Sequence, residues 1–306
     1  MAVEKAALLY NAFTTLLILL AFPRMDHPGQ MIVERVLIAG GTLLLARLSR
    51  LYPCRLMGGL RAAVQLLLLS YWYPDTYEFN RLLPNLDHVF ASAEQWLFGC
   101  QPAVLFSERL PQRWVSELLN LGYVSYYPLI GLTVFSSLLF YFHRFEETVF
   151  TITASFFIFY LIFLFVPVAG PQYYYPAIGL DNVAAGIFPP VNDYFNFHQE
   201  LLPGPDGGDG FFYNLVDISQ QVGERPTAAF PSSHVGLSTI LMIMAWRDCR
   251  PLFFILLPFY LLLCLATVYI QAHYLIDAIV GFVFSFAVYA LVTRLYHRLF
   301  AREVYG

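Results

Sequence analysis

Residues 230–238 read "FPSSHVGLS", and this stretch stands where a long polar segment gives way to a strongly apolar one. Residues 272–281 read "AHYLIDAIVG" and again place ionisable side chains, His273 and Asp277, at the start of an apolar run. The 39 residues between His234 and His273 match two membrane helices joined by a short turn. Such a hairpin brings the chain back to the side where it started. We therefore expect both histidines at one depth on one side of a membrane.

The composition is that of a membrane protein. Of the 306 residues 58% are hydrophobic and 12% are charged, whereas a soluble domain carries about 25% charged residues. The sequence predicts an all-α integral membrane protein with about eight transmembrane helices of roughly 20 residues each. The predicted spans are residues 6–22, 31–48, 57–73, 118–141, 149–169, 233–246, 252–271 and 275–293. A net charge of −4 without a dense basic patch argues against a nucleic-acid partner.

The distribution of basic residues predicts the orientation. Eleven of the 17 Lys and Arg residues fall at one set of span ends, so both termini are expected in the cytoplasm. We predict two N-terminal helices in residues 1–56, a six-span catalytic core in 57–294 and a cytoplasmic tail in 295–306. Two long loops of the core, 74–115 and 170–230, would then face the outside.

The four cysteines indicate neither a disulfide nor a metal site. The predicted topology puts Cys54 and Cys249 inside, Cys100 outside and Cys264 within a span. A reducing cytoplasm would keep the inner pair apart. No Cys or His cluster has the spacing of zinc ligands, so we expect no metal.

The two histidines and the aspartate suit covalent catalysis. His273 and Asp277 are four residues apart and share one helix face. The Asp277 carboxylate could hold the His273 imidazole in one tautomer through a hydrogen bond of about 2.6–3.2 Å. We expect the His234 and His273 rings to lie within roughly 10 Å of each other. Taken alone, His234 reads equally well as an interfacial anchor, and the "HxxxD" spacing as a satisfied hydrogen bond. Together, at the entrance of two membrane helices, they favour a catalytic site.

The residues around His234 predict an anion site. Ser232 or Ser233 can cap the helix that starts there, and the free amides of a helix N-terminus attract anions. Arg225 is the one cation in the polar segment leading to this point. We expect these groups to hold a phosphate while one histidine attacks phosphorus and the other protonates the leaving oxygen.

At these residues the chain resembles the type 2 phosphatidic acid phosphatase superfamily, whose motifs are KxxxxxxRP, PSGH and SRxHYxxD over a six-span core. "ERPTAAFPSSH" (224–234) and "IQAHYLID" (270–277) carry the match. The resemblance implies that His273 is the nucleophile, Asp277 orients it, His234 is the acid-base partner, and Arg225 holds phosphate. No metal or organic cofactor is implied.

Three positions depart from the family motifs. Ile218 stands at the Lys of the first motif, Ser233 at the Gly of the second, and Gln271 at the Arg of the third. A phosphate monoester carries close to two negative charges and rewards several cations, whereas a diester carries one. The missing cations therefore favour a diester donor, with Ser232, Ser233 and Gln271 near its phosphate.

Softer motifs resemble one branch of the superfamily. "WLFG" (96–99), "LGYVSYYPLIG" (121–131) and "GPQYYYPAIGL" (170–180) are similar to fungal inositol phosphorylceramide synthase, the aureobasidin target. This resemblance implies sphingolipid metabolism and transfer of phosphoinositol to a ceramide-like alcohol. Four tyrosines are candidates for the headgroup pocket: Tyr173, Tyr174, Tyr175 and Tyr274.

The sequence thus predicts a lipid phosphotransferase that acts on the outer face of the membrane through a phosphohistidine. Its partners would be a phospholipid donor and a lipid alcohol acceptor, and no oligomeric state is indicated. One alternative is a lipid phosphate or isoprenyl diphosphate phosphatase that uses the same residues. Others are a transporter with a His273–Asp277 proton relay, which the lack of ionisable groups in mid-span disfavours, and a lipid-binding scaffold.

Overall fold

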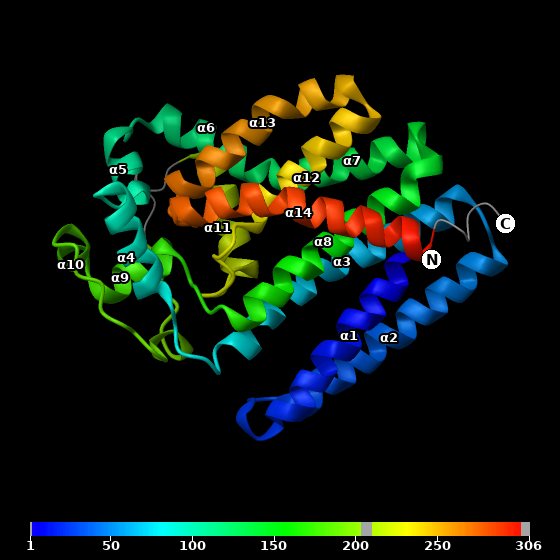
Figure 1. The fold of residues 1–306 in the computed structure, drawn as a ribbon, viewed down its shortest axis with the longest axis horizontal. Helices are drawn as coiled ribbons and strands as arrows, with labels where there is room; N and C mark the ends of the chain where they lie inside the picture. The colour runs from blue at the N-terminus through cyan, green and yellow to red at the C-terminus, as the bar shows by residue number, and fades with distance from the viewer. Residues whose placement is uncertain (1, 203–209, 301–306) are drawn as a thin grey trace. The chain divides into compact units, whose positions relative to one another are not determined.

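The computed structural model describes residues 2–202 and 210–300, and throughout these residues the regular structure is helical, without strands. The all-α prediction is confirmed. The α-helices, labelled in Figure 1, are α1 (Ala2–Ala21), α2 (Pro28–Leu51), α3 (Arg55–Asn80), α4 (Asp87–Phe98), α5 (Pro102–Arg109), α6 (Arg113–Val124), α7 (Tyr126–Phe140), α8 (Phe145–Phe165), α9 (Pro171–Ile178), α10 (Leu180–Ala184), α11 (Phe211–Gly223), α12 (Ser233–Asp248), α13 (Arg250–Tyr269) and α14 (Leu275–Leu299). Short 3₁₀ turns occur at Phe22–Arg24, Phe142–Arg144 and Tyr194–Asn196.

Several helices are long and apolar enough to cross a bilayer. Within the described residues these are Ala2–Arg24, Arg113–Phe140, Phe142–Phe165, Arg250–Tyr269 and Leu275–Leu299. They are consistent with an integral membrane protein. The other predicted spans fall on α2, α3 and α12, and α12 has 16 residues, fewer than the roughly 20 that a span needs. The count of eight spans stays a prediction.

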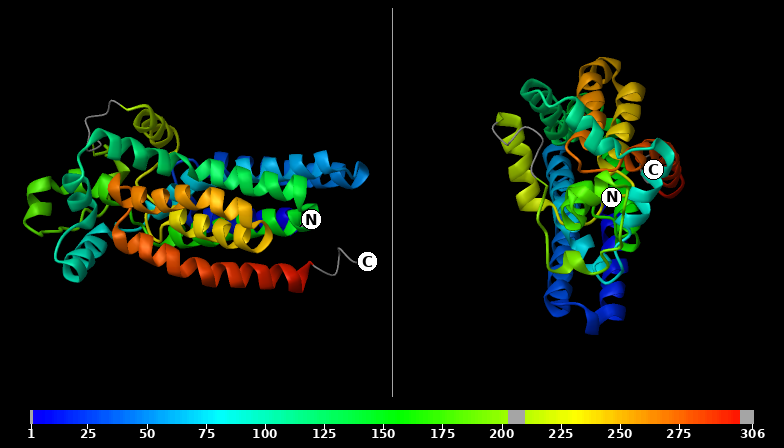
Figure 2. Two further views of the ribbon diagram at one scale, coloured as in Figure 1. Left: turned by 90° about the horizontal axis from the view of Figure 1, so that it is seen from above. Right: turned by 90° about the vertical axis from the view of Figure 1, so that its left-hand side faces the viewer.

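The chain forms two compact units that interleave along the sequence. The first contains the described residues up to Trp72, Val134–Ile158, and those from Val288 onward. Its helices α1 and α2 form an antiparallel hairpin, drawn in blue in Figures 1 and 2. Aromatic packing fixes α1 in this unit, because the Tyr10 ring stacks on Phe157 at 4.4 Å between centroids and meets Trp72 edge-on at 5.3 Å.

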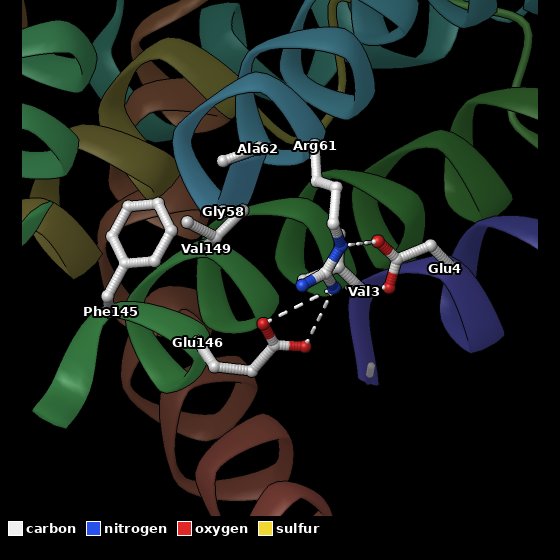
Figure 3. A pocket seen from close by; sticks show the side chains of 8 residues that line it. All are labelled: Val3, Glu4, Gly58, Arg61, Ala62, Phe145, Glu146 and Val149. Atoms are coloured by element: carbon white, nitrogen blue, oxygen red, sulfur yellow. Dashed lines mark hydrogen bonds and ion pairs between the residues drawn. The ribbon is translucent and has the colours of Figure 1, made fainter. Parts of the chain in front are cut away.

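A partly buried ion-pair cluster also belongs to the first unit. Arg61 Nε donates to Glu4 at 2.6 Å, Nη2 donates to the other Glu4 oxygen at 2.8 Å, and Nη2 reaches Glu146 at 3.3 Å. Figure 3 shows these three side chains around a small pocket that apolar groups complete. The guanidinium is planar and bidentate here, a geometry that suits paired carboxylates.

The second unit contains Tyr73–Thr133 and Phe159–Ala287. Helices α12 and α13 form a hairpin, yellow to orange in Figure 2, and α13 also packs on α6. The approach of α6 to α13 is close, since a Cβ on Gly122 would lie 2.7 Å from the Leu262 backbone. Helix α11 rests on α6, with Val216 packed among Val115, Leu119 and Tyr123 in a shared apolar cluster.

The two long loops predicted from the sequence are largely helical in this unit. Helices α4 and α5 lie within 74–115, and α9, α10 and α11 lie within 170–230. The amphipathic stretch at residues 86–99 forms α4, which ends on Gly99 in the left-handed region with φ +68°. Part of the second loop, residues 203–209, and the end of the predicted tail, 301–306, lie outside the described residues. The predicted domain boundaries stay predictions.

Candidate active site

The structure brings the two histidines into contact. His234 lies in the first turn of α12, and His273 lies in the short connection between α13 and α14. His273 Nε2 is 3.4 Å from His234 Nδ1, and the ring centroids are 5.6 Å apart. This separation falls within the limit of roughly 10 Å expected from the hairpin geometry. The two sequence motifs therefore meet at one place.

The hydrogen bonds of His273 define its tautomer. Its Nδ1 is 2.8 Å from the Ala229 carbonyl oxygen, and because a carbonyl only accepts, Nδ1 must carry the proton. The lone pair of Nε2 then faces His234. Burial lowers the pKa of His273 to about 4, so the ring is neutral at pH 7. A neutral imidazole whose Nε2 carries no proton is the form that can attack phosphorus.

The predicted hydrogen bond between Asp277 and His273 is wrong. Asp277 Oδ2 lies 3.8 Å from His273 Nδ1, beyond hydrogen-bond distance, and instead accepts from the Tyr274 backbone N–H at 2.9 Å. The reason is local: Asp277 is the third residue of α14, and its carboxylate reaches back to the start of the helix as in a capping box. The Ala229 carbonyl takes the orienting role instead.

Strained backbone stands on both sides of that contact. Ala228 and Gln271 have φ of 67° and 63°, a region that residues other than glycine rarely adopt. Ala228 precedes the carbonyl that holds His273, and Gln271 lies two residues before His273 itself. Strain of this kind concentrates at functional sites.

The start of α12 has the predicted cap. Ser232 is the N-cap, and its hydroxyl accepts from the Val235 backbone N–H at 3.4 Å. The backbone N–H of Ser232 donates to the Asp277 carbonyl at 3.0 Å, which ties the two motifs together. Ser233 begins the helix and is buried. An anion at this N-terminus remains a proposal.

A pair of glycines sets the distance between the motifs. A Cβ on Gly281 of α14 would lie 2.4 Å from the Ser232 carbonyl oxygen, and one on Gly236 of α12 would lie 2.3 Å from the Phe159 ring. The first clash would be with rigid backbone. Helices α12 and α14 therefore cross at a distance that only glycine permits here, two residues beyond His234.

The side chains of Arg225 and Gln271, which are predicted phosphate ligands, form hydrogen bonds within the protein. Arg225 Nη1 donates to the Glu224 carbonyl at 2.8 Å. Gln271 Nε2 donates to the Ser107 hydroxyl at 3.2 Å, while its Oε1 is buried without a hydrogen-bond partner among the described residues. Both lie close in sequence to the histidine contact, and their role toward phosphate stays a prediction.

The four tyrosines proposed for the headgroup pocket are buried. The Tyr174 hydroxyl donates to the Pro189 carbonyl at 2.8 Å, Tyr175 to Gln101 at 2.7 Å, and Tyr274 to Asp87 at 3.0 Å. These three are fully enclosed and Tyr173 is 3% exposed. The four rings belong to one hydrophobic cluster, and a contact of these rings with a headgroup stays a prediction.

Sequence reasoning missed two carboxylates on α4. Asp87 accepts four hydrogen bonds, two of them from the backbone N–H groups of Ala169 and Gly170 at 2.7 and 2.8 Å. Glu94 accepts from the Ile276 N–H at 3.0 Å, at the start of α14. They are seven residues apart on the buried face of α4, and that spacing was the available signal.

Glu94 and Asp277 each keep one oxygen without a partner. Glu94 Oε2 and Asp277 Oδ1 are buried and lack hydrogen bonds within the described part of the chain. Burial raises the pKa of Glu94 to about 7, with the charge of Asp277 acting in the same direction and the Ile276 N–H against it. The carboxyl groups of Glu94, from α4, and of Asp277 thus both lie at the first turn of α14, directly after His273.

A third missed carboxylate, Glu224, lies between α11 and α12. Its side chain accepts from the Tyr123 hydroxyl at 2.9 Å and from Gln172 Nε2 at 2.8 Å. The Tyr123 ring stacks on His234 at 4.7 Å with 28° between planes. Glu224 is therefore linked to the histidine pair through the Tyr123 side chain. It directly precedes Arg225 in the first motif, and that adjacency was the available signal.

The chain was compared with known proteins. The family model of the PAP2 superfamily, the superfamily that the motifs resemble, matches residues 88–291. This range contains both histidines, Asp277 and Glu94, and it begins one residue after Asp87. The same comparisons found no matching curated protein and no matching solved structure.

Proposed function

The chain belongs to the PAP2 superfamily, and we propose that it is a lipid phosphotransferase that moves a phosphorylated headgroup from a phospholipid to a lipid alcohol. Membership of the superfamily supports a phosphatase- or phosphotransferase-type function on lipids. The finer proposal names phosphoinositol as the transferred group and a ceramide-like alcohol as the acceptor. The observation that supports phosphotransfer at this site is the contact between His273 Nε2 and His234 Nδ1 at 3.4 Å, with His273 Nδ1 bound to the Ala229 carbonyl.

The proposed reaction has two steps. In the first, the negative charge of the bound diester favours the protonated form of His234, His273 Nε2 attacks phosphorus, the bond from phosphorus to the diacylglycerol oxygen breaks, and His234 gives its proton to that oxygen. A phosphohistidine and free diacylglycerol result. In the second, His234 takes the proton of the acceptor hydroxyl, the acceptor oxygen attacks phosphorus, and the phosphorus–nitrogen bond breaks. Both histidines return to their starting states.

The charges around the site support a diester donor over a monoester. Gln271 occupies the position of a family arginine, and its side chain binds Ser107. Ile218 occupies the position of the family lysine, and its side chain is 58% exposed on α11. Each missing charge-assisted contact is worth roughly 1.5–3 kcal/mol to a phosphate oxygen. A diester, with one negative charge, loses less than a monoester.

Purified protein in mixed micelles tests the proposal. Given labelled phosphatidylinositol with and without ceramide, it should form a new phospholipid only with ceramide, and His273→Asn should abolish this product. Rapid release of free phosphate from phosphatidic acid or isoprenyl diphosphate, with no transfer, would establish the phosphatase alternative. The double variant Ile218→Lys, Gln271→Arg should raise monoester hydrolysis if the missing cations set the preference.

We also propose that the site faces the outside and that both termini are cytoplasmic. The support is the excess of basic residues at one set of span ends. We expect a cysteine at Asp206, in the predicted outer loop 170–230, to react with an impermeant thiol reagent, but this position lies outside the described residues. Glu200, with 71% of its side chain exposed, is therefore the probe. With Cys100 replaced by serine, Glu200→Cys should react with an impermeant thiol reagent in intact cells. Reaction only after permeabilisation would reverse the orientation.

A further inference from the structure

The side chains next to the histidine pair include a group with no role in the phosphotransfer steps. It consists of Glu224, Gln172, Gln220 and Tyr123, and we call it the Glu224 group. Gln220 Nε2 donates to Gln172 Oε1 at 2.9 Å, and Gln172 Nε2 donates to Glu224 at 2.8 Å. The residues come from α6, α9, α11 and the segment after α11, so the fold converges on this point from four directions.

The Glu224 group lies beside the reacting atoms. Tyr123 donates to Glu224 at 2.9 Å and its ring stacks on His234. The charge of Glu224 also acts on His273, where it favours the protonated ring. Glu224 is partly exposed, so a bound molecule can reach it. Glu224 is therefore linked to His234 through the single side chain of Tyr123, and we expect the headgroup of a donor bound at the histidine pair to lie near this carboxylate.

The chemistry of the Glu224 group suits hydroxyl groups rather than a phosphate. Its hydrogen-bonded neighbours, two amides and a phenol, are neutral and do not cancel a negative charge on Glu224. Burial raises the pKa of this carboxyl, and the hydrogen bonds from Gln172 and Tyr123 oppose that rise. The negative charge of Glu224 repels a phosphate dianion. An ionised carboxylate can accept about four hydrogen bonds, so adjacent hydroxyls can both donate to it. A ribose hydroxyl binds an acidic residue in the same way in nucleotide-binding folds.

A quaternary ammonium headgroup fits the group less well. The charge of Glu224 would attract such a cation, but a quaternary ammonium is bound mainly by the open faces of aromatic rings and has no N–H hydrogen to donate to the carboxylate. The Tyr123 face lies against the His234 ring at 4.7 Å, and Tyr126 also packs on His234 at 4.5 Å. The amides of Gln172 and Gln220 would gain nothing from it. Hydroxyls, which donate and accept, match amides and carboxylate alike.

We propose that the Glu224 group is the headgroup subsite of the donor, that it binds the adjacent hydroxyls of a polyol headgroup, and that Glu224 selects such diesters over phosphate monoesters. The inference rests on the proposed function, because it supplies the donor specificity of the same site. Phosphatidylinositol and phosphatidylglycerol both offer this chemistry, and their relative rates would distinguish a ring polyol from a short one.

The test measures diacylglycerol release and phospholipid formation separately. Purified protein would be assayed in mixed micelles with phosphatidylinositol, phosphatidylglycerol, phosphatidylcholine or phosphatidic acid, each with and without ceramide. Glu224→Gln should lower kcat/KM for the two polyol donors by about 10- to 100-fold, the loss expected for hydrogen bonds to a charged group. Phosphatidic acid cleavage should stay equal or rise. Asp217→Asn, the same charge change on α11 with a partner in Gln221, is the matched control and should leave the donor ranking unchanged.

The outcomes separate the two proposals. If Glu224→Gln selectively slows diacylglycerol release from polyol donors while no phospholipid forms with ceramide, the subsite stands and the transferase proposal fails. If transfer occurs but Glu224→Gln slows every donor equally, or the wild type prefers phosphatidylcholine or phosphatidic acid, the subsite is overturned. Should Glu224→Gln fail to fold, Gln220→Leu, at the far end of the chain of bonds, should lower the polyol rates about 10-fold. An unchanged ranking in that variant overturns the subsite equally.

Discussion

The two compact units differ in what surrounds their carboxylates. In the first, Arg61 is bound by the buried Glu4 at 2.6 Å and by the partly exposed Glu146 at 3.3 Å, so both carboxylates have a cation. In the second, Glu94 and Asp277 share a helix start, and each has a buried oxygen without a hydrogen bond in the described chain. A buried charge pair is costly to break, whereas an unsatisfied buried carboxylate oxygen calls for another explanation, and a functional role is one of them.

The comparison predicts that loss of the central histidine removes activity and leaves the fold intact. His273→Asn should lower kcat by at least about 10³-fold, because nucleophile and acid-base partner act as a unit. The amide can still donate to Ala229, so the thermal transition should move little. Transfer is measured with labelled donor, and folding by gel filtration after heating. Retention of more than a tenth of wild-type activity would exclude His273 as the nucleophile.

The reverse pattern is expected for the first unit. Arg61→Met leaves Glu4 and Glu146 with no guanidinium between them, which should destabilise the protein by about 3–5 kcal/mol. Activity per folded molecule should be unchanged. The control is Arg81→Gln, which removes a partly exposed pair with Glu78 at 3.6 Å and a cation–π contact with Tyr77, together worth about 1–2 kcal/mol. If Arg61→Met is as stable as Arg81→Gln, buried pairing does not hold this unit together.

The unpaired carboxyl of Glu94 predicts a pH dependence. Burial raises its pKa from 4.5 to about 7, so its contribution to stability is complete below about pH 4.5 and is lost as the pH rises through about 7. The shift corresponds to about 3 kcal/mol. Glu94→Gln keeps a neutral acceptor for the Ile276 N–H and should be more stable than the wild type at pH 8 but not at pH 5. The exposed Glu108→Gln on α5 is the control; an equal pH dependence in wild type and Glu94→Gln would contradict the prediction.

The sequence predicts the local features of the site well and the long-range ones poorly. The Ser232 cap and the meeting of His234 with His273 follow from helix-start chemistry and span length, both readable along the chain. The orienting contact of His273 comes from the Ala229 carbonyl, 44 residues earlier, and a backbone acceptor leaves no mark in a sequence pattern.

The same limit explains the missed carboxylates. Glu94 contacts Ile276 across 182 residues, and Glu224 contacts Tyr123 across 101. Their partners are a backbone N–H and a tyrosine within an apolar helix, and neither belongs to a motif. The amphipathic pattern of α4 shows which face is buried, but an acidic residue on that face appears only as an exception until its partner is known.

The smallest expected effect concerns the helix crossing that joins the two motifs. Gly281→Ala would place a Cβ 2.4 Å from the Ser232 carbonyl oxygen, and because that atom is backbone at the helix cap, α12 and α14 must separate. We expect a loss of stability of about 1–3 kcal/mol. The displacement also moves His234 away from His273, and a shift of about 1 Å in reacting groups can slow a reaction by up to about 100-fold. Gly131→Ala in α7, where a Cβ meets nothing within 4 Å, is the matched control and should leave both quantities unchanged. Activity should fall further than stability alone explains, measured as kcat per folded molecule at a temperature where both variants are fully folded. If Gly281→Ala lowers stability but keeps wild-type kcat, the spacing of the histidines does not depend on this crossing, and the second unit holds its site by other contacts.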